Sequence, residues 1–303
     1  MDGVLVIDKP TGWTSHDVVA KIRSVTKIKK VGHTGTLDPF ATGVLPLTMG
    51  RATRLTSYFQ ASDKEYRGVI RFGFATSTYD VDGDPVGTDT SPELDFLRLE
   101  AIFTNYTGSI TQQLPPYSAK KFQGKPLYAY ALRGIEVDPG TKQVTVKSLK
   151  LLGVKGAEAE FEITCTSGTY VRTLAHDIGR DYGSGAHLLH LRRIRSGSFS
   201  IDAAVPLKDE HDYYPREIFI DRIIPLHDLL TEIPAIVISD GDIKKLVNGM
   251  DLNLLTVDWE SERFRLLDSS GNLVSLACKV QAFTSQAPQP ACWIRIHPQV
   301  TFQ

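Results

Sequence analysis

The chain has 303 residues, of which 42% are hydrophobic and 23% are charged, and its formal net charge is −1. This length suits one large or two ordinary domains, which bury a sufficient core without disulfides or a structural metal. Cys165, Cys278 and Cys292 are odd in number and far apart, which excludes a secreted disulfide framework and a zinc ribbon. The N-terminus lacks a basic leader, and no stretch reaches the roughly 18 apolar residues of a membrane span. A cytoplasmic protein is therefore expected.

The small net charge conceals four blocks of alternating sign. Residues 1–60 hold 8 Lys and Arg against 4 Asp and Glu, and residues 115–200 hold 13 against 7. Residues 61–114 hold 4 against 9, and residues 201–303 hold 9 against 15. A basic face built from the first and third blocks would neutralise the phosphates of a nucleic acid. Chance variation along the chain explains the blocks equally well on this observation alone.

Strands and helices alternate irregularly along the chain. Apolar runs predict strands at residues 3–8, 44–49, 65–74 and 143–166. Helical periodicity predicts a first helix capped by Ser15 and closed by Lys27, Lys29 and Lys30, with later helices at 92–103, 127–133, 170–182 and 240–248. Because no strand–helix unit repeats, we expect an α+β fold with a mixed, largely antiparallel sheet rather than a barrel or a doubly wound sheet. A composition change predicts domains at 1–230 and 231–303.

Common phosphate-binding and metal-binding motifs do not fit this chain. Residues 32–36 read Gly-His-Thr-Gly-Thr, which lacks the spacing of a dinucleotide loop and the lysine of a nucleoside triphosphate loop. Residues 80–84 begin like a calcium loop, but Pro85 follows and Ser91 stands where the last ligand should be, so we expect a solvated acidic turn. His187 and His190 lack a third ligand in the sequence. No metal and no nucleotide cofactor are expected.

The loop from Gly32 to Gly43 is the unusual element of the sequence. Its three glycines and Pro39 restrict the backbone, and they present one carboxylate, Asp38, between a basic helix end and an apolar strand. Two interpretations are open at this point. Asp38 is a catalytic acid, or its side chain supports the turn before Pro39 through an Asx hydrogen bond.

Six stretches of sequence carry a resemblance to a known family. They are KPTGWTS at 9–15 with GHTGTLDPFATGVLP at 32–46, KEYR at 64–67, YSAKK at 117–121, GTYVRTLAHDIG at 168–179 and GAHLLHLRR at 185–193. Their order and spacing closely resemble the TruB family, the bacterial tRNA pseudouridine-55 synthases. One departure is visible, because Leu114 stands where that family usually has the first proline of Gln-x-Pro-Pro-x-Tyr. The segment from Pro234 resembles the small RNA-binding PUA domain, mainly by position.

The resemblance implies a fold, a reaction and a partner. The fold would be a sheet of the pseudouridine synthase type with flanking helices and loops, an RNA-contacting insertion at about 112–142, and a PUA-like β-rich domain at 231–303. The reaction would isomerise a uridine in the T loop of tRNA, within the TΨC arm, to pseudouridine. It involves no net redox change or phosphate transfer, so no cofactor is expected. The partner would be tRNA, bound by a monomer.

The resemblance also implies roles for individual residues. Asp38 matches the essential aspartate, Arg172 matches the arginine that compensates its charge, and Tyr66 matches the tyrosine that stacks on the target base and assists proton removal. His33 would fill the gap left when the nucleotide flips out of the RNA. The remaining implied substrate contacts are Tyr170 and Leu191, which would line the uracil pocket, with Lys9, Pro10, Lys120 and Lys121.

The basic blocks also offer candidate phosphate contacts, and two alternative functions remain open. The basic blocks offer Lys27, Lys29, Lys30, Lys125, Arg192 and Arg193 as candidate phosphate contacts. A non-catalytic RNA-binding protein would use the same basic surface without needing Asp38. A nucleosidase or glycosidase usually needs a second placed carboxylate or a metal, and the sequence offers neither beside Asp38.

Overall fold

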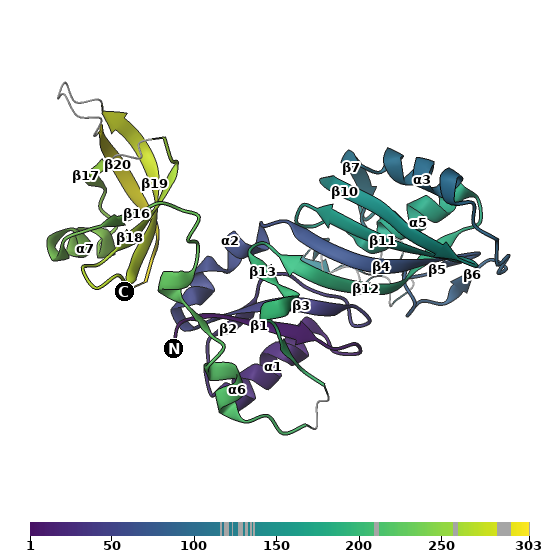
Figure 1. Cartoon of the computed structure of the whole chain (residues 1–303), viewed down its shortest axis with the longest axis horizontal. Helices are drawn as coiled ribbons and strands as arrows, with labels where there is room; N and C mark the ends of the chain where they lie inside the picture. Colours follow the sequence, from purple (N-terminus) through teal and green to yellow (C-terminus); the bar gives the residue numbers. More distant parts are fainter. Residues whose placement is uncertain are drawn as a thin grey trace.

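The computed structural model describes residues 1–302 except 116, 118–120, 123, 127–129, 131–132, 134, 136, 209–211, 257–259 and 284–291. Figure 1 shows one long mixed sheet, flanked by helices, and a smaller second sheet at one end of the molecule. The predicted helix at 127–133 lies largely outside the described residues.

The described strands of the long sheet follow an order that mixes distant parts of the chain. The order is β14 (Val205–Pro206), β1 (Gly3–Lys9), β3 (Thr42–Met49), β12 (Ala186–Ser196), β4 (Lys64–Phe72), β11 (Glu158–Cys165), β10 (Thr141–Lys155) and β7 (Gly108–Gln113). Beside this path, β2 (Val31–His33) pairs with β3, β13 (Phe199–Ser200) with β12, and β15 (Ile224–Pro225) with β1. The pairs β1–β14 and β12–β3 are parallel and the remaining pairs of this sheet are antiparallel. The prediction of a mixed, largely antiparallel sheet is confirmed.

Strand β1 is buried on both faces of the sheet. Leu5 and Ile7 join the main apolar cluster, whereas Val4 and Val6 join a second cluster on the opposite side. Because successive side chains of a strand point to opposite faces, a strand between two apolar layers needs a continuous apolar run. The run at the N-terminus of the sequence meets that need.

Three of the longer helices cover much of the main cluster. They are α1 (Ser15–Thr26), α3 (Phe96–Asn105) and α5 (Val171–Tyr182). Phe219 of the short helix α6 (Arg216–Ile220) also belongs to this cluster. The cap of α1 is Thr14 and not Ser15, because Thr14 and Asp17 form a reciprocal capping box. The Ser15 hydroxyl instead accepts from the Leu37 N–H at 2.8 Å and so ties α1 to the Asp38 loop.

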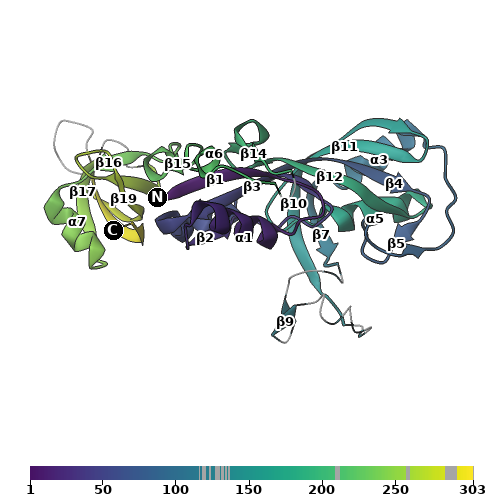
Figure 2. The ribbon, with the colours of Figure 1, turned by 90° about the horizontal axis from the view of Figure 1, so that it is seen from below.

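The other elements are short. They are the 3₁₀ turns η1 (Gly50–Leu55), η2 (Ile201–Ala203) and η3 (Leu226–Asp228), helices α2 (Thr56–Gln60) and α6 (Arg216–Ile220), and strands β5 (Ala75–Thr76), β6 (Pro85–Val86), β8 (Lys121–Phe122) and β9 (Lys125–Pro126). Figure 2 shows β9 set apart from the long sheet, beyond β7 and β10.

Three predicted elements have different bounds from those observed. Helix α1 ends at Thr26, because Lys27 adopts left-handed backbone angles with φ 61°, so Lys29 and Lys30 lie beyond the helix. The strand predicted at 143–166 is two antiparallel strands, β10 and β11, joined by a turn at Gly156 with φ 57°. Helix α3 starts four residues later than predicted, because the Asp95 side chain caps it by accepting from the Arg98 N–H.

The C-terminal part has its own sheet and core. Its described strands follow the order β16 (Ala235–Val237), β18 (Arg263–Leu267), β19 (Leu273–Phe283), β20 (Cys292–Thr301) and β17 (Leu252–Thr256), with helix α7 (Asp240–Val247) against them. Side chains from α7 and from these strands form a separate apolar cluster. The C-terminal part is therefore a β-rich unit, as expected.

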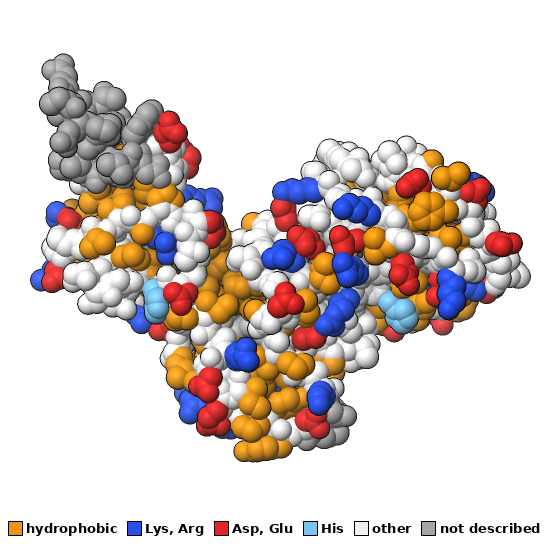
Figure 3. All heavy atoms as spheres, in the orientation of Figure 1, with side chains coloured by type: hydrophobic (Ala, Val, Ile, Leu, Met, Phe, Trp, Pro, Cys, Tyr) orange, Lys and Arg blue, Asp and Glu red, His pale blue; other side chains and the backbone are white. Residues whose placement is uncertain are grey.

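A shared apolar cluster joins the C-terminal part to the long sheet. Leu226, Leu229, Leu230 and Ile233 from the connecting segment lie in it, with Leu273, Leu276 and Phe302 from the second sheet and Val4, Val6 and Phe59 from the first part. Arg51 and Arg54 also donate to the carbonyls of Phe302 and Thr301. Figure 3 shows hydrophobic side chains gathered where the two parts meet.

Strands β3 and β12 approach closely at Gly43. This glycine has φ 102° and pairs with Arg193, and a Cβ built on it would lie 2.2 Å from the Arg193 carbonyl oxygen. A side chain at this position is therefore excluded by both backbone angle and contact. The glycine sets the distance between the Asp38 loop and β12.

We expect Gly43→Ala to lower the free energy of unfolding by about 3 kcal/mol, the sum of left-handed strain and overpacking. Urea denaturation of the two proteins measures this decrease. Gly12→Ala is the control, because Gly12 also has a positive φ of 81° but has no atom within 4 Å of a built Cβ. Equal decreases in the two variants would show that the contact with Arg193 contributes nothing.

Candidate active site

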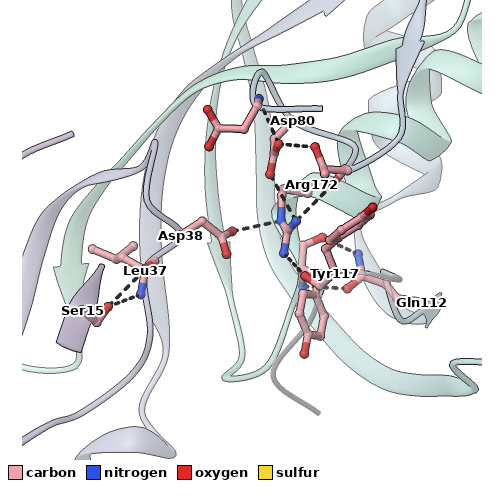
Figure 4. A network of polar contacts seen from close by, with 10 residues as sticks. Ser15, Leu37, Asp38, Asp80, Gln112, Tyr117 and Arg172 are labelled. Carbon is pink, nitrogen blue, oxygen red and sulfur yellow. Dashed lines mark hydrogen bonds and ion pairs between the residues drawn. The ribbon is translucent and has the colours of Figure 1, made fainter. Parts of the chain in front are cut away.

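The Asp38 carboxylate faces Arg172, which lies in the first turn of α5 (Figure 4). Nε of Arg172 lies 3.0 Å from Oδ2 of Asp38, and the two side chains are 6% and 35% exposed. The fold thus brings together the two residues whose pairing the sequence predicted. The carboxylate contacts a buried cation and still has a solvent-accessible side.

Arg172 contacts two carboxylates and two backbone carbonyls. Nη1 donates to Oδ2 of Asp80 at 3.2 Å and to the Thr78 carbonyl at 3.1 Å, and Nη2 donates to the Tyr117 carbonyl at 3.0 Å. Nε is close to Asp38 but makes no aligned hydrogen bond. The guanidinium therefore does not pair bidentately with Asp38, because Asp80 and the carbonyls occupy its other edge.

Asp80 is a site residue that the sequence interpretation missed. Its side chain is only 5% exposed, so the expected solvated acidic turn is wrong for Asp80, although Asp82 and Asp84 are exposed. The Thr78 hydroxyl and the Asp82 N–H donate to it, and the Asp82 bond is 3.2 Å long. Residues 77–79 form a turn, with Tyr79 at φ 67°, so no strand-like alternation in the sequence marks Asp80 as buried.

Opposing effects set the protonation of Asp38. Burial raises the pKa of the Asp38 carboxyl, and the nearby charge of Asp80 raises it further, whereas Arg172 and Lys9 act to lower it. The net direction is upward from the ordinary value. The ionised form of Asp38 at neutral pH thus depends on these two cations.

Tyr66 and Leu191 lie on the same face of the sheet, next to the Asp38 loop. In the antiparallel register of β4 and β12, Tyr66 opposes Arg193 and Gly68 opposes Leu191. Directly opposed residues, and residues two apart on one strand, share a face, so Tyr66 and Leu191 do too. Both side chains are nearly buried, at 8% and 7% exposed. Burial raises the pKa of Tyr66 above its ordinary value, so the phenol is neutral at physiological pH. Its ring suits stacking on a planar ligand.

Gln112 fixes the residue at the start of α5. The buried Gln112 amide accepts from the Tyr170 N–H at 3.0 Å and donates to the Tyr170 carbonyl at 3.2 Å. Tyr170 is the residue just before α5. These two hydrogen bonds therefore fix the start of the helix and, with it, the position of Arg172. The sequence interpretation gave Gln112 no role, and its position before Tyr117 was the only signal.

His33 ends β2 beside the Asp38 loop and is partly buried. Its Nδ1 accepts from the Gly35 N–H at 3.4 Å. Burial lowers the pKa of His33, and the charges of Arg193 and His16 lower it further. The ring is therefore neutral at physiological pH, which suits stacking on a nucleobase.

Lys9 does not face a substrate-accessible surface. The residue is fully buried, and Nζ donates to the carbonyls of Pro10 at 2.9 Å, Trp13 at 2.6 Å and Pro39 at 3.1 Å. Burial lowers the pKa of Lys9 to about 8. Its predicted substrate contact is corrected to a supporting contact, because three carbonyls occupy the three N–H donors. Pro10 is partly exposed.

The predicted phosphate contacts divide into exposed and buried residues. Lys27, Lys29 and Lys30 are exposed. Arg192 pairs with Asp8 at 2.7 Å, and Arg193 is 1% exposed, so a phosphate contact by Arg193 is ruled out in this structure. Lys120 lies outside the described residues, and Lys121 and Lys125 are described only as strand positions of β8 and β9.

The described residues contain no group of three His, Cys, Asp or Glu side chains that could hold a metal ion. His187 is buried, with Nδ1 3.2 Å from the Phe74 carbonyl, whereas His190 is exposed. No helix in the described part of the chain is long and apolar enough to cross a membrane.

Comparisons with known proteins find relatives over most of the chain. Residues 23–171 match the model of the TruB family pseudouridylate synthase N-terminal domain, and residues 172–232 match that of the tRNA pseudouridylate synthase B C-terminal domain. The tRNA pseudouridine synthase B of Solibacter usitatus is 44% identical over 251 residues, 83% of this chain and 86% of the relative. That of Syntrophus aciditrophicus is 37% identical over 302 residues, 96% of each chain.

A solved H/ACA ribonucleoprotein bound to a substrate RNA containing 2′-deoxyuridine includes a similar chain, with a TM-score of 0.72 and 25% identity, covering 99% of this chain and 85% of that one. The family models and the relatives identify the chain as a pseudouridylate synthase, which is an isomerase. Within that class, it belongs to the TruB family.

We expect Asp80→Asn to lower the pKa of Asp38, because a like charge is removed, and to lower the free energy of unfolding by about 1–3 kcal/mol. Carboxyl-carbon NMR titration of Asp38 and urea denaturation measure the two effects. Asp82→Asn is the control, because Asp82 is exposed and its charge raises the pKa of Asp38 less than that of Asp80 does. If both variants changed the pKa of Asp38 equally, Asp80 would have no special place beside Arg172.

Proposed function

We propose that this chain isomerises a uridine in the T loop of tRNA, at position 55, to pseudouridine, with Asp38 as the catalytic group. The observation that carries the proposal is the partly exposed Asp38 carboxylate held against the buried Arg172 in a TruB family chain. The substrate is supported by the relatives, which are named tRNA pseudouridine synthase B.

The chemistry needs one carboxylate and no redox partner. The bond between uracil N1 and ribose C1′ breaks, the base turns, and a bond between C5 and C1′ forms. C5 loses a proton and N1 gains one, so the product is an isomer of the substrate. Asp38 acts either as a nucleophile on the base or sugar or as a base that removes a sugar proton. In each route it must start ionised, so the neighbouring cation Arg172 favours the active form.

The target uridine must leave the stacked RNA before it reaches Asp38. Flipping costs a few kcal/mol, which binding must supply. We assign His33 to the gap left in the RNA, because its neutral ring lies beside the Asp38 loop and stacking is worth about 1–3 kcal/mol per base. Tyr66 would stack on the flipped base, with Tyr170 and Leu191 lining the rest of its pocket.

Two further regions would bind the rest of the RNA. These are the insertion at about 112–142, which includes Lys120 and Lys121, and the PUA-like domain at 231–303. The exposed Lys29 and Lys30 extend this surface from the end of α1. A monomer in the cytoplasm remains the prediction from the sequence.

Asp38→Asn should abolish pseudouridine formation and leave the Kd for tRNA within about threefold, because the charge serves the chemistry and the loop serves binding. Chemical mapping of pseudouridine in unmodified tRNA and filter binding measure these effects. Asp82→Asn is the matched control and should keep its activity. Turnover above about one per cent in Asp38→Asn would contradict the role of Asp38. Release of free uracil by the wild type would indicate a glycosidase instead.

Binding to tRNA should weaken steeply with salt, although the net charge is −1, because counterion release depends on the local basic face. Lys29→Gln with Lys30→Gln should flatten the log–log salt slope by roughly one unit for each lysine that pairs with a phosphate, without changing which uridine reacts. Glu217→Gln with Asp221→Asn, in the acidic C-terminal block, should leave the slope unchanged. Equal effects in the two double variants would mean that the charge blocks are chance variation.

A further inference from the structure

Arg193 is a fully buried arginine behind the Asp38 loop. Its side chain is among the largest fully buried ones in the described residues, at 1% exposed. Burying a guanidinium is costly unless its donors are satisfied with good geometry. The contacts that compensate for this burial therefore indicate what Arg193 does.

The Arg193 guanidinium holds both ends of the segment from Gly35 to Val44. Nη2 donates to the Gly35 carbonyl at 3.1 Å, and Nε donates to the Val44 carbonyl at 2.6 Å. Asp38 lies between these two residues in the sequence. The close pairing of Gly43 with the backbone of Arg193 holds the same end of the segment a second time.

The same guanidinium reaches Tyr66. The two residues oppose each other across β4 and β12, so their side chains share a face of the sheet. The charge of Arg193 and a hydrogen bond from it both act to lower the pKa of Tyr66, against the larger effect of burial. Arg193 thus bonds to both ends of the segment that carries Asp38 and lies beside Tyr66.

Two buried lysines, Lys9 and Lys64, lie near Arg193. Their like charges raise the free-energy cost of burying the guanidinium. The charge of Arg193 lowers the pKa values of Lys9 and Lys64, which burial brings to about 8 in each case. Lys64 Nζ donates to the carbonyls of Phe59, Gln60 and Ser62. A lysine at position 193 would have a compact ammonium instead of a planar fork, so it could not span Gly35 and Val44 in the same way.

We propose that Arg193 is a positioning residue that fixes the segment Gly35–Val44, and with it Asp38, against Tyr66. The roles of Asp38 and Tyr66 in this statement rest on the proposed function. The contacts of Arg193 with the loop carbonyls do not depend on that function, so they can be tested separately.

The test compares Arg193→Lys and Arg193→Met with Arg195→Lys and Arg195→Met. Arg195 lies on the same strand, is exposed and pairs with Glu65 at 3.4 Å, so it is a matched control. The first readout needs no activity. Hydrogen exchange of the Leu37 and Ala41 amides, which bond within and to the loop, should become about tenfold faster in Arg193→Lys and stay unchanged in the Arg195 variants.

The second readout is the pH dependence of single-turnover pseudouridine formation at saturating tRNA. The charge of Arg172 acts to lower the pKa of Asp38, and a loosened loop weakens that contact, so the acid limb should move to higher pH in Arg193→Lys. The maximal rate should fall about tenfold, while the Kd for tRNA and its salt slope stay unchanged. A purely structural role would lower stability without moving the acid limb.

Several results would overturn the proposal. The proposal fails if a folded Arg193→Lys protein has unchanged exchange rates at the Leu37 and Ala41 amides. It also fails if the acid limb of the pH–rate profile stays in place. A flatter salt slope with weaker tRNA binding would make Arg193 a phosphate contact instead. Arg193→Lys keeps a charge and a donor, so it remains the informative variant if Arg193→Met does not fold. Faster exchange in Arg193→Lys, together with a wild type that forms no pseudouridine, would retain the positioning role and reject the proposed function.

Discussion

The site depends on one buried guanidinium, that of Arg172, shared between two carboxylates. Asp80 holds it from the side of the 76–84 loop, and Asp38 meets it from the side open to a substrate. A cation this deeply buried must be compensated on several sides, and the Thr78 and Tyr117 carbonyls complete the set. Elements that are far apart in the sequence therefore converge on the first turn of α5, and Asp38 gains a fixed partner without being enclosed.

The loop that carries Asp38 is held mainly through its backbone. Side chains from α1, β1 and β12 bond to its carbonyl and N–H groups, while the Asp38 carboxylate contacts Arg172. This arrangement separates two tasks. Lys9 and Arg193 fix the path of the chain. The charges of Arg172 and Lys9 oppose the rise in the pKa of Asp38 that burial causes, so Lys9 contributes to both tasks.

Local patterns in the sequence were sufficient for some residues and not for others. The apolar run of β1 and the motifs around Asp38 and Arg172 are read within a few residues, and the structure contains the predicted strand and the predicted Asp38–Arg172 pair. Asp80, Gln112, Lys9 and Arg193 are different, because each is buried by segments distant in the sequence. A count of charges does not distinguish a buried charged side chain from an exposed one, so Asp80 was assigned to solvent and Arg193 to phosphate. Lys9 was predicted to contact the substrate, and Gln112 was given no role.

The apolar cluster between the two sheets makes the burial of β1 depend on the C-terminal part. Phe302 and Leu276 of the second sheet pack in one layer with Val4 and Val6, which belong to the strand beside the Asp38 loop. Cutting the chain near residue 230 would open that layer to water and leave the outer face of β1 uncovered. The boundary therefore divides two patterns of sequence, while one apolar layer runs across it and packs the two parts together.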